Sequence, residues 1–239
     1  MARTSPKNSF GNWLLDHLAP AAQERIRAQL VPLPLIANHT IHEPGEAATE
    51  AVFPTSGLIS LVSMMEDGTS VEVGMIGKEG MFGASMVLGD DRPQQRAMVQ
   101  LEGTALKMPV RVLRQEIEAD AGWKGLLLLY AQVTLTTATQ AAACNRLHLL
   151  EQRFARWPLA AHDRAERDTF PLTHEFLAMM LGVRRPGVTV AAQSLQSDGI
   201  ISYNHGTMTI VDRKGLEATS CECYRTIQQE MKRLLGLSS

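Results

Sequence analysis

The sequence has few cysteines and few aromatic residues, and its first segment lacks a hydrophobic core. Three of the 239 residues are cysteines and 5% are aromatic. Three cysteines cannot build the disulfide framework of a secreted domain, and such scarcity is typical of a reducing compartment. The opening MARTSPKNSFGNW contains no apolar run of signal-peptide length. We therefore expect a cytoplasmic protein.

One uncharged stretch, residues 125–145, is long enough to be compared with a membrane span. Its centre is rich in threonine and glutamine, a poor composition for contact with lipid. We expect a buried helix here and no membrane partner.

The chain also lacks the strong basic excess of many nucleic-acid-binding domains, because its net charge is −2. The charge is unevenly divided. Residues 1–145 carry 11 Lys and Arg against 15 Asp and Glu, whereas residues 146–239 carry 12 against 10. The second half is the more basic, which favours DNA binding only weakly.

Motifs of common enzyme classes are missing. The sequence has no Gly-rich phosphate loop, no His-Glu-x-x-His and no Gly-x-Ser-x-Gly. Its carboxylates are scattered over segments that we expect at the surface. We therefore expect no enzyme and no catalytic residue.

Metal and cofactor sites are weakly indicated. A four-cysteine iron–sulfur cluster needs one thiolate more than the chain has. Cys221 and Cys223 fall within an expected helix, where positions two apart point about 200° apart, so they would not share one zinc ion. We expect structural cysteines, Cys144 included, and no metal site. Haem ligation by one of the seven histidines stays open, and no pattern identifies a cofactor.

The segment from Leu172 to Ser197 has the pattern of two short helices joined by a tight turn. Thr173 is a suitable N-cap for the first helix, and Gly182 supplies the backbone freedom that a sharp turn needs. The second helix is expected to begin near Arg185, which is followed by a proline in the first turn. This is the layout of a helix-turn-helix. Helical spacing places Val188, Ala191 and Leu195 on a buried face and Arg185, Thr189 and Gln193 on the opposite face.

A predicted hairpin follows the second helix. After the turn dipeptide Asp198-Gly199, the sequence IISYNHGTMTIVD alternates as two short strands around Asn204-His205-Gly206. A helix-turn-helix followed by such a hairpin is typical of a winged helix.

These residues carry a family resemblance that covers most of the chain. LGVRRPGVT and DGIISYNHGTMTIVDRKGLE resemble the winged-helix half of the Crp/Fnr family of bacterial transcription regulators. Residues 42–46, 54–60 and 80–83 resemble the cyclic-nucleotide-binding-type jelly roll of the same family. The resemblance implies a homodimeric regulator that binds double-stranded DNA at an inverted repeat, with RNA polymerase and an unknown small-molecule effector as further partners. The alternative is a ligand-binding or protein-interaction module without sequence-specific DNA binding.

The expected fold class is α+β, with three parts. Residues 1–123 form an antiparallel β-roll with an N-terminal helix over residues 11–31, which ends at Pro32 and Pro34. Residues 124–150 form a dimerisation helix, and residues 151–239 form the winged-helix domain with one final helix from Arg213 to about Leu235.

The dimerisation helix should carry an apolar seam at coiled-coil-like spacing. A helix that only packs on its own roll is the alternative. Farther on, Pro158 predicts a kink or a new helix start, and the charged segment His162 to Asp168 is the expected exposed connection. The seam is expected at Leu128, Ala131, Leu135, Ala138, Ala142, Asn145 and Leu149.

The resemblance also implies which residues contact DNA. Arg185 matches the first base-contacting arginine of the family, whereas Pro186 and Val190 replace a glutamate and an arginine that often follow. We therefore expect a target sequence different from that of the cyclic-AMP receptor. The expected DNA-binding residues are Thr173, His174, Arg184, Arg185, Thr189, Gln193, Asn204 and His205.

The resemblance places ligand-binding residues at Gly83 and Arg96 of the β-roll and at Thr139 of the dimerisation helix. Two positions depart from the cyclic-nucleotide pocket: Ala84 stands where a glutamate holds the ribose, and Gln95 where an arginine holds the phosphate. Because neighbouring strand residues point to opposite faces, Arg96 is not expected to replace that arginine. DNA binding is thus expected to be independent of cyclic AMP.

Overall fold

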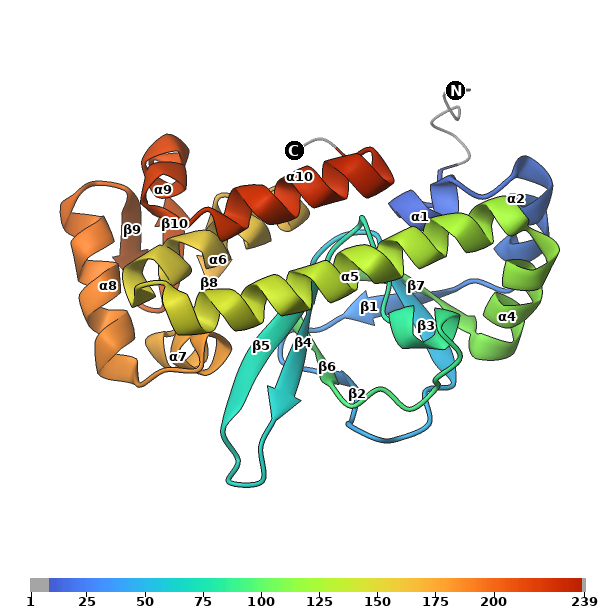
Figure 1. Ribbon diagram of the computed structural model, residues 1–239, viewed down its shortest axis with the longest axis horizontal. Helices are drawn as coiled ribbons and strands as arrows, with labels where there is room; N and C mark the ends of the chain where they lie inside the picture. Colours follow the sequence, from blue (N-terminus) through green and yellow to red (C-terminus); the bar gives the residue numbers. More distant parts are fainter. Residues whose placement is uncertain (1–8, 238–239) are drawn as a thin grey trace. The chain divides into compact units, whose positions relative to one another are not determined.

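The computed structural model describes residues 9–237, and it confirms the α+β class (Figure 1). The chain divides into two compact units. One unit comprises the chain through Ser60 together with Ile76–Thr134, and the other comprises Leu61–Met75 and the chain from Leu135 onward. Among the helices of the described range, none is long and apolar enough to cross a membrane.

The N-terminal helix predicted over residues 11–31 is instead two short helices, α1 (Trp13–Asp16) and α2 (Pro20–Arg27). Pro20 cannot donate a backbone hydrogen bond to the preceding turn, so it begins a new helix. The segment that contains Pro32 and Pro34 is a strand, and both prolines fit there because the strand lies at a sheet edge.

The predicted antiparallel strands are present and form two sheets. One sheet has the order β1-β7-β3 and the other β2-β6-β4-β5. Pairing of β7 with β1 and β3, and of β2 with β6, is antiparallel. Large apolar side chains such as Phe53, Leu58 and Leu101 are fully buried. The strands are β1 (Val31–Leu35), β2 (Thr40–His42), β3 (Glu50–Pro54), β4 (Leu58–Met64), β5 (Ser70–Ile76), β6 (Arg96–Leu101) and β7 (Gly103–Pro109).

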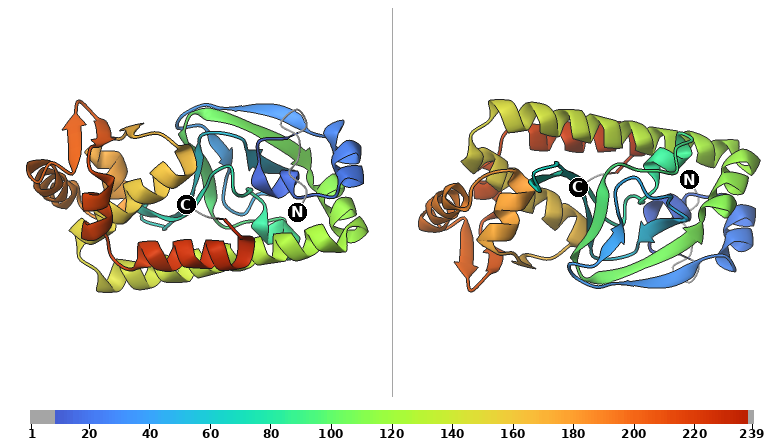
Figure 2. Two further views of the ribbon diagram at one scale, coloured as in Figure 1. Left: turned by 90° about the horizontal axis from the view of Figure 1, so that it is seen from above. Right: turned by 90° about the horizontal axis from the view of Figure 1, so that it is seen from below.

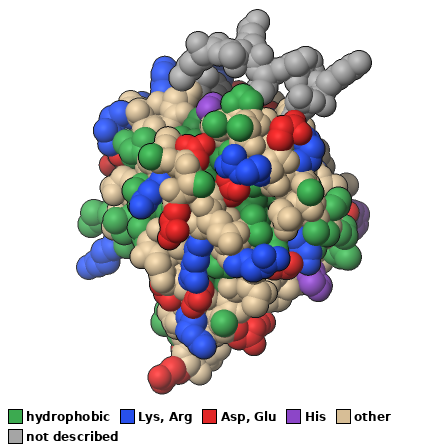
Figure 3. Space-filling model, turned by 90° about the vertical axis from the view of Figure 1, so that its right-hand side faces the viewer, with side chains coloured by type: hydrophobic (Ala, Val, Ile, Leu, Met, Phe, Trp, Pro, Cys, Tyr) green, Lys and Arg blue, Asp and Glu red, His purple; other side chains and the backbone are tan. Residues whose placement is uncertain are grey.

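Surface charges of the first unit are mixed in sign. Figure 3 views the right-hand side of Figure 1, where acidic and basic side chains are interspersed. An ion pair of 2.6 Å joins Arg25 on α2 to Glu116 on α4 (Val110–Ala119). This face offers no basic field of the kind that attracts DNA.

The long helix predicted within residues 124–150 is confirmed as α5 (Ala121–Leu147). Trp123 Nε1 donates to the Leu14 carbonyl at 3.0 Å, and the Tyr130 hydroxyl donates to the Met81 carbonyl at 3.1 Å. These bonds attach the first part of α5 to the roll. A short helix, α3 (Ala84–Val87), precedes β6.

The predicted seam of α5 is partly wrong. Ala131 is buried within the chain's own core, whereas Leu135 is 58% exposed. Some of the exposed positions of α5 instead alternate in steps of four and three, as a coiled-coil stripe requires. They are Leu128, Gln132, Leu135, Thr139, Ala142 and Arg146, and Leu149 continues the spacing just beyond the helix.

The helix after α5 runs through its proline. Helix α6 (Leu150–Ala165) contains Pro158. Of the two predicted effects of this proline, a kink or a new helix start, the second is therefore wrong. The predicted exposed connection is also wrong, because residues 162–165 belong to α6 and Arg164 is buried. A three-residue strand, β8 (Thr169–Pro171), follows.

The final helix is interrupted, contrary to the prediction of one helix from Arg213. Helix α9 (Arg213–Thr219) and helix α10 (Cys223–Leu235) are separate. Figure 2 shows α10 beside the C-terminal part of α5, where Gln140 Nε2 lies 3.1 Å from Cys223 Sγ.

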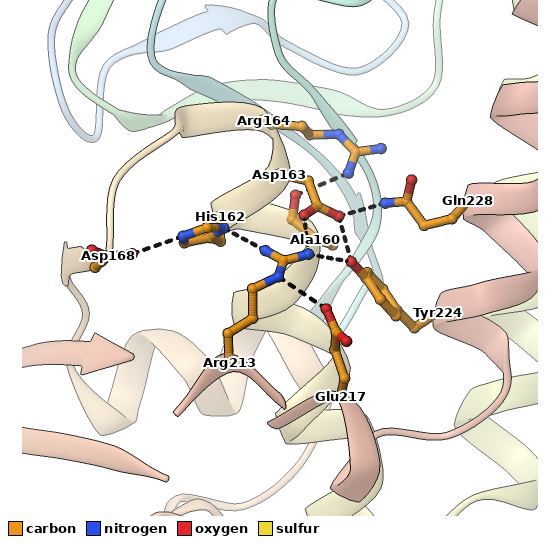
Figure 4. Close-up of polar contacts among 9 residues, drawn as sticks. All are labelled: Ala160, His162, Asp163, Arg164, Asp168, Arg213, Glu217, Tyr224 and Gln228. Atoms are coloured by element: carbon orange, nitrogen blue, oxygen red, sulfur yellow. Dashed lines mark hydrogen bonds and ion pairs between the residues drawn. The ribbon is translucent and has the colours of Figure 1, made fainter. Parts of the chain in front are cut away.

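A polar network fixes α6, α9 and α10 to one another (Figure 4). The Asp163 carboxylate accepts from Arg213 at 2.7 Å and from the Tyr224 hydroxyl at 2.8 Å, and Gln228 donates to it as well. Burial beside this carboxylate raises the pKa of the Tyr224 hydroxyl. The network holds α9 and α10, the two helices that follow the hairpin, against α6.

Candidate nucleic-acid interface

The predicted turn between two helices is present. Helix α7 (His174–Leu181) is capped by Thr173, whose hydroxyl accepts from the Phe176 amide at 3.1 Å. Gly182 ends the helix with a φ of +62°, a left-handed conformation that favours glycine. The N-cap and the glycine each depend on one residue, so this turn could be predicted correctly from the sequence.

Helix α8 (Arg185–Ser197) has the predicted two faces. Val188, Ala191 and Leu195 are buried against its neighbours. The opposite face is exposed at Arg185 and Gln193, and Thr189 is half-buried between them. Val190 is 66% exposed, a large share for an apolar side chain in the middle of a helix.

The hairpin is formed by β9 (Ile201–Asn204) and β10 (Thr207–Ile210). Its two-residue turn, His205-Gly206, has φ values of +46° and +77°, which suit the twist of a tight hairpin. Strand β8 pairs with β10 and makes a three-stranded sheet, which the sequence pattern did not reveal.

The hairpin turn lies close to the start of α7. A Cβ added at Gly206 would meet the Thr173 side chain at 3.5 Å. The Leu172 amide donates to the Gly206 carbonyl at 2.7 Å, and the Tyr203 hydroxyl donates to the Leu172 carbonyl. The structure therefore brings together the expected DNA-binding residues of α7, α8 and the wing.

His174 has a different environment from the one expected for a DNA contact. Its Nδ1 lies 3.0 Å from Thr189 Oγ1, and its ring lies against Tyr203 with centroids 4.6 Å apart. The Thr189 hydroxyl can donate to the Arg185 carbonyl at 3.2 Å, which leaves it to accept from His174. Through these contacts, the His174 side chain connects α7 to α8 and to the wing.

The exposed cations differ in their partners. Arg185 forms an ion pair of 2.8 Å with Glu175 of α7, and both side chains are more than 60% exposed. Arg184, the N-cap residue of α8, is exposed at the same end. Asn204 and His205 are exposed at the tip of the hairpin.

In the β-roll, a cavity is lined by residues other than Gly83 and Arg96. This cavity of about 280 Å³ is lined by residues of β1–β3, by Phe82 and by Val99. Arg96 alternates to the face of β6 opposite Val99, and it is paired with Glu43 at 2.9 Å. Gly83 has a φ of +129°, and an added Cβ would meet Met81 at 2.8 Å.

Thr139 is exposed on α5, and its hydroxyl donates to carbonyls of its own helix. The acceptors are Leu135 and Thr136, each at 3.0 Å. The hydroxyl is therefore already satisfied within α5.

Comparisons with known proteins agree with both halves of this architecture. Residues 33–120 match the family model of the cyclic nucleotide-binding domain, and residues 149–219 match that of the Crp-like helix-turn-helix domain. A curated relative, the transcriptional regulator SdrP of Thermus thermophilus, is 26% identical over 164 residues, which are 67% of this chain and 79% of that protein. The chain belongs to the Crp/Fnr family of transcription regulators.

Solved structures of other Crp/Fnr proteins share the fold. A transcriptional regulator of this family from Eubacterium rectale matches with a TM-score of 0.68 at 18% identity, over 88% of this chain and 99% of that one. FixK2 from Bradyrhizobium japonicum matches with a TM-score of 0.69 at 15% identity, over 80% of this chain and 98% of that one. These likenesses concern the fold, and it is the match of residues 149–219 to the Crp-like helix-turn-helix model that marks the DNA-binding domain.

Proposed function

We propose that this Crp/Fnr protein is a cytoplasmic homodimer that binds an inverted-repeat operator through α8 and the hairpin wing, without control by cyclic AMP or cyclic GMP. The observation that carries the proposal is the exposed face of α8. It combines a cation, an amide and an apolar side chain at Arg185, Gln193 and Val190. Such a face suits hydrogen bonds and methyl contacts in a major groove.

Arg185 is the principal base-contacting residue of the proposal. Arg185 is the first residue of α8, and its guanidinium can donate two hydrogen bonds to guanine O6 and N7. The ion pair between Arg185 and Glu175 is exposed and therefore weak. Arg185 can leave this carboxylate and bind a base with little loss of free energy. Gln193 and Val190 would contact further bases, the latter through a thymine methyl group.

Phosphate contacts would come from the rim of this surface. Arg184 and Thr173 lie at helix N-termini, where backbone amides and the helix dipole also favour an anion. Asn204 and His205 extend the rim along the wing. Thr189 would contribute through its methyl group, because its hydroxyl is bonded to the protein.

The exposed stripe of α5 supports the homodimer. Leu128, Leu135 and Ala142 of α5, and Leu149 just beyond its end, recur every seven residues, and the three leucines have 42–73% of their surface exposed. Pairing with the same stripe of a second copy would bury them around a twofold axis. Two copies of α8 would then contact half-sites about one helical turn apart.

Independence from cyclic nucleotides is supported by charge. A buried cyclic phosphate needs a cation, because an unpaired buried charge is costly. Arg96 is already neutralised by Glu43 and points away from the cavity, while Gln95 and Ala84 offer no charge. The cavity is accordingly better suited to a less polar effector.

Fluorescence anisotropy with labelled duplexes tests the proposal. A duplex selected from a random library should bind more tightly than an unselected one, and affinity should fall steeply as salt rises, because phosphate contacts release counterions. Equal, weak binding of both duplexes would favour the alternative, a ligand-binding or protein-interaction module.

A further inference from the structure

The three cysteines of the chain and one histidine meet at a single point. Cys144 lies near the end of α5 and His148 lies just beyond it, while Cys221 and Cys223 lie at the junction of α9 and α10. Their sulfur and nitrogen atoms all lie within 4.8 Å of one another. All three cysteines are at least 97% buried.

The break between α9 and α10 makes this meeting possible. On a continuous helix, Cys221 and Cys223 would point about 200° apart. Because α9 ends at Thr219 and α10 begins at Cys223, the backbone at Ser220 is extended instead. The continuous helix was wrong, so the geometric argument against a shared ion no longer applies.

We propose that Cys144, His148, Cys221 and Cys223 bind one zinc ion with tetrahedral geometry. Three cysteines and one histidine are an established ligand set for structural zinc, with Zn–S of about 2.3 Å and Zn–N of about 2.0–2.1 Å.

The distances fit such an ion. A tetrahedron with those bond lengths separates two sulfurs by about 3.8 Å and a sulfur from a nitrogen by about 3.5 Å. The sulfurs of Cys144 and Cys221 are 3.5 Å apart, and Cys223 Sγ lies 3.4 Å from His148 Nδ1. All four ligand atoms lie within 4.8 Å of one another, so side-chain movements of at most about an ångström would centre the ion.

Neighbouring polar groups are arranged as they are around zinc ligands. His148 Nε2 lies 3.1 Å from a carboxylate oxygen of Glu222, so it can carry the proton and leave Nδ1 free to bind the ion. Gln140 Nε2 donates toward Cys223 Sγ at 3.1 Å, which suits a thiolate. Glu222 stands between the two cysteines in the sequence, so one short segment supplies two ligands and the carboxylate.

Hydrogen bonds and burial act in opposite directions on two thiols of the cluster. The hydrogen bond from Cys221 and the positive charge of Arg156 lower the pKa of Cys144, whereas the same hydrogen bond and burial raise the pKa of Cys221. Each thiol gives up its proton when it binds zinc, so uptake of the ion would release protons.

Other uses of these sulfurs fit less well. A disulfide requires sulfurs about 2.0 Å apart and would leave the histidine and its carboxylate without a role. An iron–sulfur cluster with four thiolates exceeds the cysteines of this chain.

Zinc at this point would connect the end of α5 to the α9–α10 junction, which follows the wing and α9 in the chain. A metal ion that joins two segments stabilises the folded arrangement of both. The ion would therefore fix the elements that flank the DNA-binding helices, independently of which sequence they bind.

Metal analysis of the full chain tests the proposal. The protein, purified under reducing conditions without chelator, should contain about one zinc ion per chain by mass spectrometry. After removal of zinc, Co²⁺ should produce a thiolate-to-metal charge-transfer band and the intense visible bands of a tetrahedral site, and Zn²⁺ should abolish both.

Variants assign the ligands. Cys221→Ser and His148→Ala should lose the tight site, and Glu222→Ala should weaken zinc binding by about 10–100-fold. His17→Ala, an exposed histidine of the first unit, is the matched control and should keep one zinc ion per chain. If a cysteine variant fails to fold, the cobalt spectrum of the unaltered chain decides.

Two results would overturn the proposal. One is a folded, reduced chain that takes up neither Co²⁺ nor Zn²⁺ and whose three thiols react equally fast with and without zinc. The other is a Cys144–Cys221 disulfide in the protein as purified from reducing conditions.

Discussion

The ion pair between Arg185 and Glu175 gives a sharp test of how α8 contacts DNA. The guanidinium lies 2.8 Å from the carboxylate, and the two side chains are 63% and 61% exposed. A pair this exposed is worth about 0–1 kcal/mol. Arg185→Ala removes a bidentate contact to one guanine and should cost about 1–3 kcal/mol, or roughly 5–150-fold in affinity, at one base pair.

Glu175→Gln should have the opposite effect. It removes the carboxylate that competes for Arg185 and one negative charge near the DNA phosphates. Binding should become tighter by up to about fivefold, the value that corresponds to the upper limit for the exposed pair. In the Arg185→Ala background this gain should shrink, because the two residues act on one another.

Fluorescence anisotropy with a selected duplex and its single-base-pair variants measures both effects. Arg184→Ala is the matched control: as a phosphate contact, it should weaken binding to all duplexes alike and reduce the salt slope by about one. If Arg185→Ala instead weakens binding equally on selected and random DNA, Arg185 is a phosphate contact and the assignment is refuted.

Three further predictions concern dimerisation, stability and the effector. Leu135→Glu introduces a charge into the stripe, so it should raise the dimer dissociation constant at least about tenfold in sedimentation experiments. Leu88→Glu changes a similarly exposed leucine outside α5 and should leave the dissociation constant unchanged. Asp163→Ala removes an acceptor of three donors and should lower the free energy of unfolding in urea by about 2–3 kcal/mol; an unchanged midpoint would contradict the role of the network. Titration calorimetry should show no binding of cyclic AMP or cyclic GMP at low micromolar concentration; saturable binding lost in Arg96→Ala would show the pocket assignment to be wrong.

Features set by local chemistry were predictable from the sequence. Thr173 caps its helix, Gly182 adopts a left-handed φ, and His205-Gly206 forms a tight hairpin turn. Each depends on the conformational preference of one or two residues. The winged helix and the faces of α8 were therefore predicted correctly.

Features set by distant contacts were not predictable. The residues around Ser220 form part of a helical pattern, yet the helix ends there, and the segments on either side contact α5 and α6 through Cys221 and Tyr224. Such tertiary contacts override helix propensity. Likewise, Pro158 lies within an uninterrupted α6, and β8 is too short to show alternation.

The same limit applies to the candidate sites. The cysteine–histidine cluster depends on the break at Ser220, which no local residue signals. His174 was expected to contact DNA, and the sequence did not reveal that its ring lies against Tyr203, a residue 29 positions later. Contacts between segments far apart in sequence thus decide both.

Footprinting of the selected operator tests the central claim, that two copies of α8 bind DNA together, most directly. We predict two protected half-sites in inverted repeat, with centres about one helical turn apart. Protection of a single, non-repeated half-site by the same protein would contradict it.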